Sequence, residues 1–187
     1  MSGVAEGARD GQGGTQPQLP AARLRVAGPD DAAALLRLKQ QLDQETSFML
    51  LEPDERDTSV PALARQLEDL ARSANSAVIV AELPGGLAGY LERTGGTFRR
   101  NRATAYLVMG VVAAAGGRGI GAALLAEAKR WAAAHGLHRL ELTVMAHNRR
   151  AFALYSRMGF SVEGRRSECL LIDGQFADEL YMAAVLG

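Results

Sequence analysis

This sequence has very little cysteine, no excess of charge of either sign and no long hydrophobic run. Its 187 residues include one cysteine, Cys169, so the chain cannot form an internal disulfide, which is typical of a reducing compartment. Lysines plus arginines number 21, as do aspartates plus glutamates, and this balance argues against partners such as nucleic acid or a membrane surface. No run approaches the roughly 20 apolar residues of a membrane helix, and the N-terminus lacks the apolar segment of a signal peptide. These absences predict a cytoplasmic protein.

Aromatic and branched apolar side chains are also nearly missing from residues 1–22, which are rich in glycine and glutamine. Such a segment cannot bury enough surface to offset the entropy that it loses on ordering. We therefore predict a disordered tail over residues 1–22 and a single folded domain over residues 23–187, a length that suits one domain.

From Arg23 onwards, strand-like and helix-like patterns alternate along the chain. Leu35, Leu38 and Leu42 recur at helical spacing after Pro29, and Thr58 or Ser59 is suited to cap a second helix. The Asp-Gly pair at 173–174 is a strong hairpin signal. The pattern predicts strands at 23–26, 77–81, 87–91, 104–112, 140–144, 160–172 and 176–185, a loop at 44–58, and helices that begin near 29, near 59, after the glycines at 116–121 and at 148.

The predicted order is strand, helix, helix, three strands, helix, strand, helix and two strands. A mixed order of this kind predicts an α/β fold in which helices cover both faces of a mixed sheet. No internal repeat is visible in the sequence.

A cluster of glycines joins strand 104–112 to the next helix. Because four of the residues 116–121 are glycines without a Cβ, main-chain N–H groups can converge there, and the helix N-terminus adds further N–H groups. This pattern predicts an anion site that suits a phosphate or pyrophosphate. A P-loop is excluded because Ala122 stands where a lysine is required, and a dinucleotide fingerprint fits poorly because its third glycine would be Leu124. A purely structural loop stays open as an alternative.

Three residues of the helix that is predicted to begin at 148 share one face. Asn148, Ala151 and Tyr155 are separated by three and four positions, so their side chains lie along one side of a helix. Each has an ordinary explanation, since an asparagine can cap a helix, an alanine can pack and a tyrosine can lie at the edge of the core. Together with the glycine cluster, however, they form an ordered pair of motifs.

These two motifs carry a resemblance to the GNAT superfamily of acyl-CoA-dependent N-acyltransferases, in element order from Arg23 to Leu186. The specific similarity rests on the segment Gly117-Arg118-Gly119-Ile120-Gly121, the pattern Asn148-x2-Ala151-x3-Tyr155 and the pair Gly159-Phe160. The resemblance implies a splayed, mixed sheet of about seven strands with about four helices on both faces. It also implies acetyl-CoA as the co-substrate and no metal.

The resemblance further implies where the cofactor lies. Strands 104–112 and 140–144 should part, and the pantetheine arm should lie between them, with the hydroxyl of Tyr155 at the thioester sulfur as general acid for the leaving thiolate. The implied cofactor-binding residues are Val111, Val112 and Ala113 through main-chain groups, Gly117, Arg118, Gly119, Ile120, Gly121 and Ala122 through N–H groups at the pyrophosphate, and Asn148 and Ala151 along the pantetheine arm.

The loop at 44–58 should form one wall of the acceptor pocket, because the family uses this region for specificity. Glu45, Phe48 and Met49 are the residues that we expect to contact the acceptor, and Glu45 would suit a cationic amine.

Two positions depart from the family pattern. Gly116 stands where the family usually has glutamine or arginine, so we expect the main chain to hold the pyrophosphate, with Arg118 as an alternative donor. Strand 104–112 has no acidic residue, although many members carry a catalytic glutamate there. The remaining candidates for a general base are Glu45, Glu92, Glu141, Asp178 and Glu179.

Residues and resemblance together predict an N-acetyltransferase that moves an acetyl group from acetyl-CoA to a primary amine of a small molecule, an amino acid or a peptide. Two alternatives stay open: a protein N-terminal acetyltransferase, and a non-catalytic acyl-CoA-binding regulatory module, which Gly116 and the missing glutamate favour. The resemblance allows a homodimer, and we expect neither nucleic acid nor a membrane as a partner.

Overall fold

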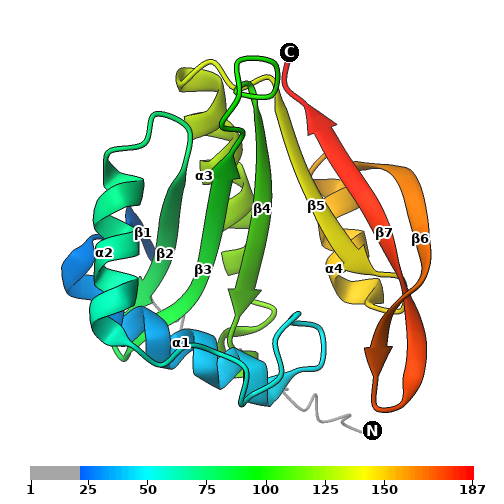
Figure 1. The fold of residues 1–187 in the computed structure, drawn as a ribbon, viewed down its shortest axis with the longest axis horizontal. Helices are drawn as coiled ribbons and strands as arrows, with labels where there is room; N and C mark the ends of the chain where they lie inside the picture. The colour runs from blue at the N-terminus through cyan, green and yellow to red at the C-terminus, as the bar shows by residue number, and fades with distance from the viewer. Residues whose placement is uncertain (1–21) are drawn as a thin grey trace, which may run out of the picture.

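The computed structural model describes residues 22–187 (Figure 1). The predicted tail over residues 1–22 therefore lies outside the described residues, except for Ala22. Strands and α-helices follow one another in the predicted order, and two short 3-10 helices are added to them. Within residues 22–187, no helix is long and apolar enough to cross a membrane.

Several strands are longer than the sequence pattern predicts, whereas β4 and β6 are each one residue shorter. The strands are β1 (Arg23–Val26), β2 (Ala77–Leu83), β3 (Gly86–Gly95), β4 (Thr104–Val111), β5 (Arg139–Met145), β6 (Ser161–Ile172) and β7 (Gln175–Val185). The helices are η1 (Pro29–Asp31), α1 (Ala32–Glu45), α2 (Val60–Ala71), η2 (Ala113–Ala115), α3 (Ile120–Ala134) and α4 (Arg149–Arg157). Residues 46–59 contain neither helix nor strand, so the predicted loop at 44–58 is confirmed except for Gln44 and Glu45, which end α1.

Local sequence signals explain where the helices begin and end. The side chain of Ser59 accepts a hydrogen bond from the N–H of Ala62 at the start of α2, and Asn148 caps α4 in the same way. The chain leaves α3 through Gly136 at φ +69° and leaves α4 through Gly159 at φ +80°, a left-handed conformation that glycine adopts without strain.

The seven strands form one sheet in the order β1-β2-β3-β4-β5-β7-β6. Every neighbouring pair is antiparallel except β4 and β5, which are parallel. These two strands pair only where residues 104–106 of β4 lie beside residues 139–141 of β5, and beyond this point they diverge (Figure 1). The predicted splayed, mixed sheet is therefore confirmed.

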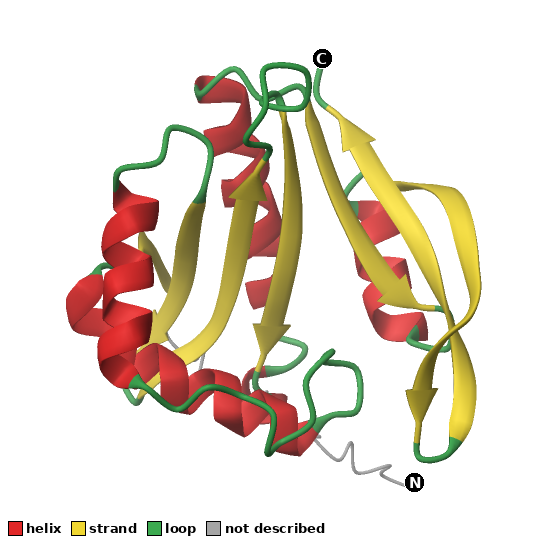
Figure 2. Cartoon of the chain, in the orientation of Figure 1, coloured by secondary structure: helices red, strands yellow, loops and turns green. Residues whose placement is uncertain are grey.

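Helices cover both faces of the sheet, but not equally. In Figure 2, α1 and α2 lie in front of the β1–β4 half, and α3 and α4 lie behind the sheet. Leu35 of α1, Leu91 of β3 and Leu124 of α3 are all fully buried, so the core of the β1–β4 half lies on both sides of the sheet. Among the described residues, no helix covers the front of the β5–β7–β6 half (Figure 2).

Candidate active site

The gap between β4 and β5 exposes main-chain groups that a regular sheet would pair. The N–H of Val112 donates to the carbonyl of Ala88 in β3 at 2.9 Å. Because successive residues of a strand point their polar groups to opposite sides, Val111 and Met109 present their N–H and C=O groups toward β5. Pairing with β5 ends at Tyr106, so these groups face the open gap. An extended chain carrying amides, such as pantetheine, can pair with them as a strand would.

Val112 and Ala113, which were expected to bind the cofactor through main-chain groups, already use these groups in hydrogen bonds within the protein. Val112 uses its N–H on Ala88 and its carbonyl on the N–H of Ala115 at 3.0 Å. The N–H of Ala113 donates to the carboxylate of Glu45 at 2.7 Å, and the carbonyl of Ala113 accepts from Gly116 at 2.9 Å. The chain turns into η2 at this point, which commits these groups to local hydrogen bonds. Of the three predicted residues, only Val111 presents its main-chain groups to the gap, together with Met109, which the sequence analysis did not name.

Tyr106 lies at the apex of the gap. Its hydroxyl is 2.7 Å from Oγ1 of Thr143 and accepts the N–H of Thr143 at 3.2 Å. Since β4 and β5 no longer pair there, the N–H of Thr143 would otherwise lack a strand partner. The phenol thus satisfies the first β5 amide beyond the paired residues and stabilises the point where the strands part.

The glycine loop presents a cradle of main-chain donors. Gly117 and Gly119 have φ values of +76° and +77°, and a Cβ at either position would meet nothing within 4 Å, so backbone conformation alone demands glycine there. α3 begins at Ile120, so its first N–H groups have no intrahelical partner. Five N–H groups find no acceptor among residues 22–187, and they belong to Gly117, Gly119, Ile120, Gly121 and Ala122. Convergent N–H groups at a helix N-terminus are suited to a pyrophosphate.

Arg150 of α4 lies against this loop at the position of the missing side chain. A Cβ at Gly116 would be 2.8 Å from Nη2 and 3.3 Å from Nη1 of Arg150. The guanidinium therefore occupies the space that a glutamine or arginine at position 116 would enter. The sequence analysis missed this residue because Arg150 is far from Gly116 in the chain and belongs to the other motif.

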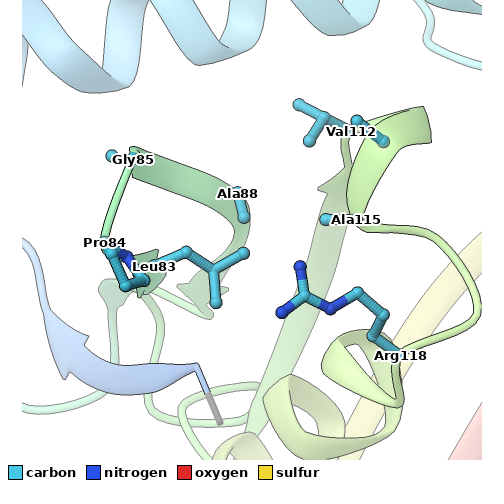
Figure 3. A pocket seen from close by; sticks show the side chains of 9 residues that line it. Leu83, Pro84, Gly85, Ala88, Val112, Ala115 and Arg118 are labelled. Atoms are coloured by element: carbon cyan, nitrogen blue, oxygen red, sulfur yellow. The ribbon is translucent and has the colours of Figure 1, made fainter. Parts of the chain in front are cut away.

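A hollow of about 370 Å³ lies beside the loop, between the turn that joins β2 to β3 and the segment that precedes α3 (Figure 3). Its walls are mostly apolar, and Figure 3 shows the guanidinium of Arg118 at one side of it. No residue of β5 or α4 lines it, so it is separate from the gap between β4 and β5. Its lining residues are Leu83, Pro84, Gly85, Gly86, Ala88, Val112, Ala114, Ala115 and Arg118.

Tyr155 of α4 has the properties of a proton donor. Its side chain is 9% exposed and packs edge-to-face on Phe160, with ring centroids 6.0 Å apart. Its hydroxyl makes no hydrogen bond to any residue in the described part of the chain. Burial raises the pKa of Tyr155 to about 12, with a smaller contribution from Tyr106. The phenol therefore keeps its proton at neutral pH and can donate it.

The two other residues of this motif have structural roles. Oδ1 of Asn148 accepts the N–H of Ala151 at 3.1 Å, so the asparagine caps α4. Ala151 is half-buried and packs on the core. Their contact with the pantetheine arm stays a prediction.

The loop between α1 and α2 reaches the same gap, and Glu45 is the last residue of α1 before this loop. Both carboxylate oxygens of Glu45 accept hydrogen bonds, one from Ala113 and one from Gln41, so this side chain ties α1 to the end of β4. Phe48 reaches across to His147, which follows β5, with ring centroids 5.3 Å apart. Met49 packs on the core. Glu45 therefore joins α1 to Ala113, and the expected contact of Glu45, Phe48 and Met49 with the acceptor stays a prediction.

The candidate general bases are all engaged with other groups. Glu92 pairs with Lys39 at 2.8 Å under α1, and Asp178 pairs with the exposed Arg165. Oε2 of Glu141 accepts the hydroxyl of Tyr181 at 2.5 Å. Glu179 is buried and accepts a hydrogen bond from the hydroxyl of Thr143. Glu141 and Glu179 therefore accept hydrogen bonds from hydroxyl groups, which Glu92 and Asp178 do not within residues 22–187.

Comparison with known proteins gives matches along most of the chain. Residues 39–160 match the family described as Acetyltransferase (GNAT) family. A GNAT-family acetyltransferase from Streptococcus pneumoniae superposes with a TM-score of 0.85 at 31% identity, covering 89% of this chain and 99% of that one. A ribosomal-protein-alanine N-acetyltransferase from Brucella melitensis superposes with a TM-score of 0.77 at 28% identity, covering 88% and 99%.

The match to a curated sequence is shorter. The ribosomal protein uS5-alanine N-acetyltransferase of Escherichia coli is 43% identical over 47 residues, which cover 25% of this chain and 24% of that protein. Two further solved chains with the same fold, at 22% and 21% identity, hold acetyl-CoA.

Proposed function

Because the chain belongs to the Acetyltransferase (GNAT) family and is therefore an N-acetyltransferase that uses acetyl-CoA, we propose that its acceptor is a primary amine of a small molecule, an amino acid or a peptide. The observation that carries this proposal is the gap between β4 and β5. Unpaired main-chain groups line it, converging N–H groups lie near one end, and the hydroxyl of Tyr155, whose side chain is largely buried, has no partner among residues 22–187.

The proposed cofactor contacts follow from these groups. The N–H groups of the glycine loop and the first turn of α3 hold the pyrophosphate, and the guanidinium of Arg150 adds a positive charge beside them. Val111 and Met109 pair with the amides of the pantetheine arm. Acetyl-CoA supplies an activated acetyl thioester, which the gap orients toward the amine.

The chemistry needs one group that accepts a proton and one that donates a proton. An aliphatic amine with a pKa near 10 is about one part in a thousand neutral at pH 7, so it must lose a proton before it attacks. The departing thiolate must gain one, and Tyr155 is the proposed donor because its pKa, raised by burial, keeps it protonated.

A second candidate is the terminal amine of a protein, which the names of two relatives favour. The Brucella melitensis and Escherichia coli proteins are both alanine N-acetyltransferases of ribosomal proteins. The Escherichia coli match covers only 24% of that protein, so its substrate is a proposal here. The domain limits 23–187, the cytoplasmic location and a homodimer stay predictions.

Thiol release from acetyl-CoA tests the proposal. The full chain is mixed with acetyl-CoA and a panel of amines, which includes a diamine, free amino acids and a peptide that begins with alanine, and a thiol-reactive dye reports the released CoA. The same peptide with a blocked N-terminus is the matched control. We expect release that depends on one class of acceptor. Tight binding of acetyl-CoA in calorimetry without release across the panel would support the non-catalytic module, and no binding at all would overturn the cofactor site.

A further inference from the structure

A chain of hydrogen bonds crosses three strands at the apex of the gap. The hydroxyl of Tyr106 in β4 lies 2.7 Å from Oγ1 of Thr143 in β5. The hydroxyl of Thr143 in turn donates to Oε1 of Glu179 in β7 at 3.0 Å. A Cβ at Gly110 would meet Leu42 of α1, so alternate residues of β4, Tyr106 included, face the side of the sheet that carries α1. On that side no helix of the described chain covers β5, β7 and β6 (Figure 1). An acceptor can therefore approach this face.

Simple counting of protons gives the chain a direction. A carboxylate only accepts, so the single hydroxyl proton of Thr143 is donated to Glu179. Thr143 then has no proton to give to Tyr106, so the phenol donates to Thr143 and its oxygen accepts the Thr143 N–H. One lone pair of the phenol oxygen is left over. It can accept an N–H from an ammonium group in the gap.

The end of the chain has a route to solvent. Glu179 is 8% exposed, and its second oxygen accepts from Arg166 of β6 at 2.7 Å, a side chain that is 57% exposed. The thiol of Cys169, also on β6, lies 3.8 Å from the same oxygen. The other charged groups on this face, Glu141, Arg139 and Glu163, are paired with one another or with Tyr181.

The opposite end of the chain, at Tyr106, lies at the apex of the gap in which the thioester is proposed to lie. Tyr106 lies close enough to Tyr155 to affect its pKa, although burial is the main cause of that shift. The two phenols belong to opposite faces of the sheet, since Tyr106 faces the side that carries α1 and Tyr155 lies on α4 behind the sheet, and they differ in their hydrogen bonds. Tyr155 is an unpartnered donor within the described residues, and Tyr106 is tied to a carboxylate through Thr143.

We propose that Tyr106, Thr143 and Glu179 form a proton relay that deprotonates the acceptor amine, in place of a glutamate on β4. This inference rests on the proposed function. An N–H bond of the ammonium breaks and its electron pair stays on nitrogen, the phenol oxygen of Tyr106 takes the proton, and the phenolic proton moves to Oγ1 of Thr143. The hydroxyl proton of Thr143 moves to Glu179, which becomes a neutral acid and later releases the proton to solvent beside Arg166. Tyr106 is the catalytic residue, and Thr143 and Glu179 act through it.

Thr143 allows a sharp test because its side chain can be changed in two ways. Thr143→Val keeps the shape and the main-chain N–H that Tyr106 accepts, but removes the relay hydroxyl. Thr143→Ser is the matched control that keeps this hydroxyl. Glu179→Gln and Tyr106→Phe interrupt the chain at its two ends. Rates are measured from pH 6 to 10 with one acceptor amine, and thermal unfolding confirms that each variant is folded.

We expect Thr143→Val and Glu179→Gln to lower kcat/KM for the amine about tenfold or more at pH 7, with the KM for acetyl-CoA within about twofold of the wild type. The deficit should shrink as the pH approaches the pKa of the amine, because the free amine then needs no base. Thr143→Ser should retain the wild-type pH profile. Wild-type profiles for both Thr143→Val and Glu179→Gln would overturn the relay and leave the proposed function standing. A wild-type protein that acetylates no amine would overturn the proposed function itself.

Discussion

β2 and β6 belong to the same sheet, yet they differ in burial along nearly their whole length. The first five residues of β2 are buried, whereas the first eight of β6 are exposed. Helices cover both faces of the β1–β4 half, and the front of the β5–β7–β6 half is uncovered among the described residues (Figure 2). The first half therefore supplies most of the buried apolar core, and the second half presents polar side chains where an acceptor can reach them.

Charged groups show the same difference. In the β1–β4 half, Lys39 pairs with Glu92 and Arg56 pairs with Asp43, and these side chains are largely covered by α1 and the loop that follows it. In the other half, Glu141 and Glu179 also pair with arginines, Arg139 and Arg166, but they accept hydrogen bonds from hydroxyl groups as well, on an uncovered face. An ion pair covered by a helix serves stability, whereas a carboxylate on an uncovered face that also ends a chain of hydroxyls can take part in proton transfer.

Tyr155→Phe should produce the largest effect. Loss of the proton donor should lower kcat about tenfold or more, while the KM for acetyl-CoA barely changes. Tyr90→Phe is the matched control, because Tyr90 is buried in the β1–β4 half and should not affect kcat. Steady-state kinetics with acetyl-CoA and the best amine measure both. Equal effects of the two substitutions would remove Tyr155 from the proposed mechanism.

The pH dependence sharpens the same assignment. Burial raises the pKa of Tyr155 to about 12, so the phenol loses its proton at higher pH than an exposed tyrosine, whose pKa is about 10. The wild-type kcat should therefore not fall near pH 10, because Tyr155 still carries its proton there. A kcat that falls with a midpoint at or below about pH 10 would contradict the role of a buried donor.

Gly119→Ala tests the loop at the boundary between the two halves. Its φ of +77° costs an alanine about 1–2 kcal/mol, although a Cβ there would meet nothing within 4 Å. If the loop of the variant relaxes away from this conformation, it must return to it before acetyl-CoA can bind. We therefore expect the affinity for acetyl-CoA to fall up to about tenfold. Gly28→Ala is the control, since Gly28 has a φ of −111° and equally open surroundings. Calorimetry measures the affinity, and equal affinities of the two variants would contradict the prediction.

Arg150→Ala should weaken acetyl-CoA binding less, by about fivefold, because one charge-assisted contact at an exposed position is lost. Acetyl-pantetheine, which lacks the pyrophosphate, should bind to both proteins equally. Arg149→Ala is the matched control on the same helix. Gly116→Arg placed in the Arg150→Ala background should restore affinity, since it returns a guanidinium to the same space. Loss of acetyl-pantetheine binding would show that Arg150 acts through folding and not through the pyrophosphate.

Arg93→Met should have the smallest effect, on stability alone. Arg93 of β3 is fully buried, and its three guanidinium nitrogens find no hydrogen-bond partner in the described residues. Burial lowers its pKa to about 10, and the guanidinium stacks 3.3 Å above the ring of Trp131. Because a buried, unpaired charge costs more than the stacking returns, we expect the free energy of unfolding to stay the same or rise by about 1–2 kcal/mol. Urea unfolding measures it, and a loss above about 2 kcal/mol would show that the stack stabilises the β1–β4 half.

Much of the fold was predictable because its signals are local. Ser59 and Asn148 mark helix starts, and Gly136 marks a helix end, through interactions within a few residues of each position. The glycine loop was also predictable, since φ values of +76° and +77° require glycine whatever surrounds the loop.

The rest of the site depends on contacts between distant residues. Glu45 and Ala113 are 68 positions apart, and Tyr106 and Thr143 are 37 apart. Neither pair has a local pattern that could reveal it. The hydrogen bond from Ala113 to Glu45 was therefore not foreseen, and Tyr106 and Arg150 were not identified at all.

The sequence by itself determined the order of strands and helices, the helix ends and the glycine-dependent loop, because each follows from the conformational preferences of neighbouring residues. Only the tertiary structure decided which main-chain groups face the gap, where Arg150 lies and how Tyr106 is linked to Glu179. These features depend on the register of strands that are far apart in the chain, and a shift of one residue would turn every one of those side chains to the other face of the sheet.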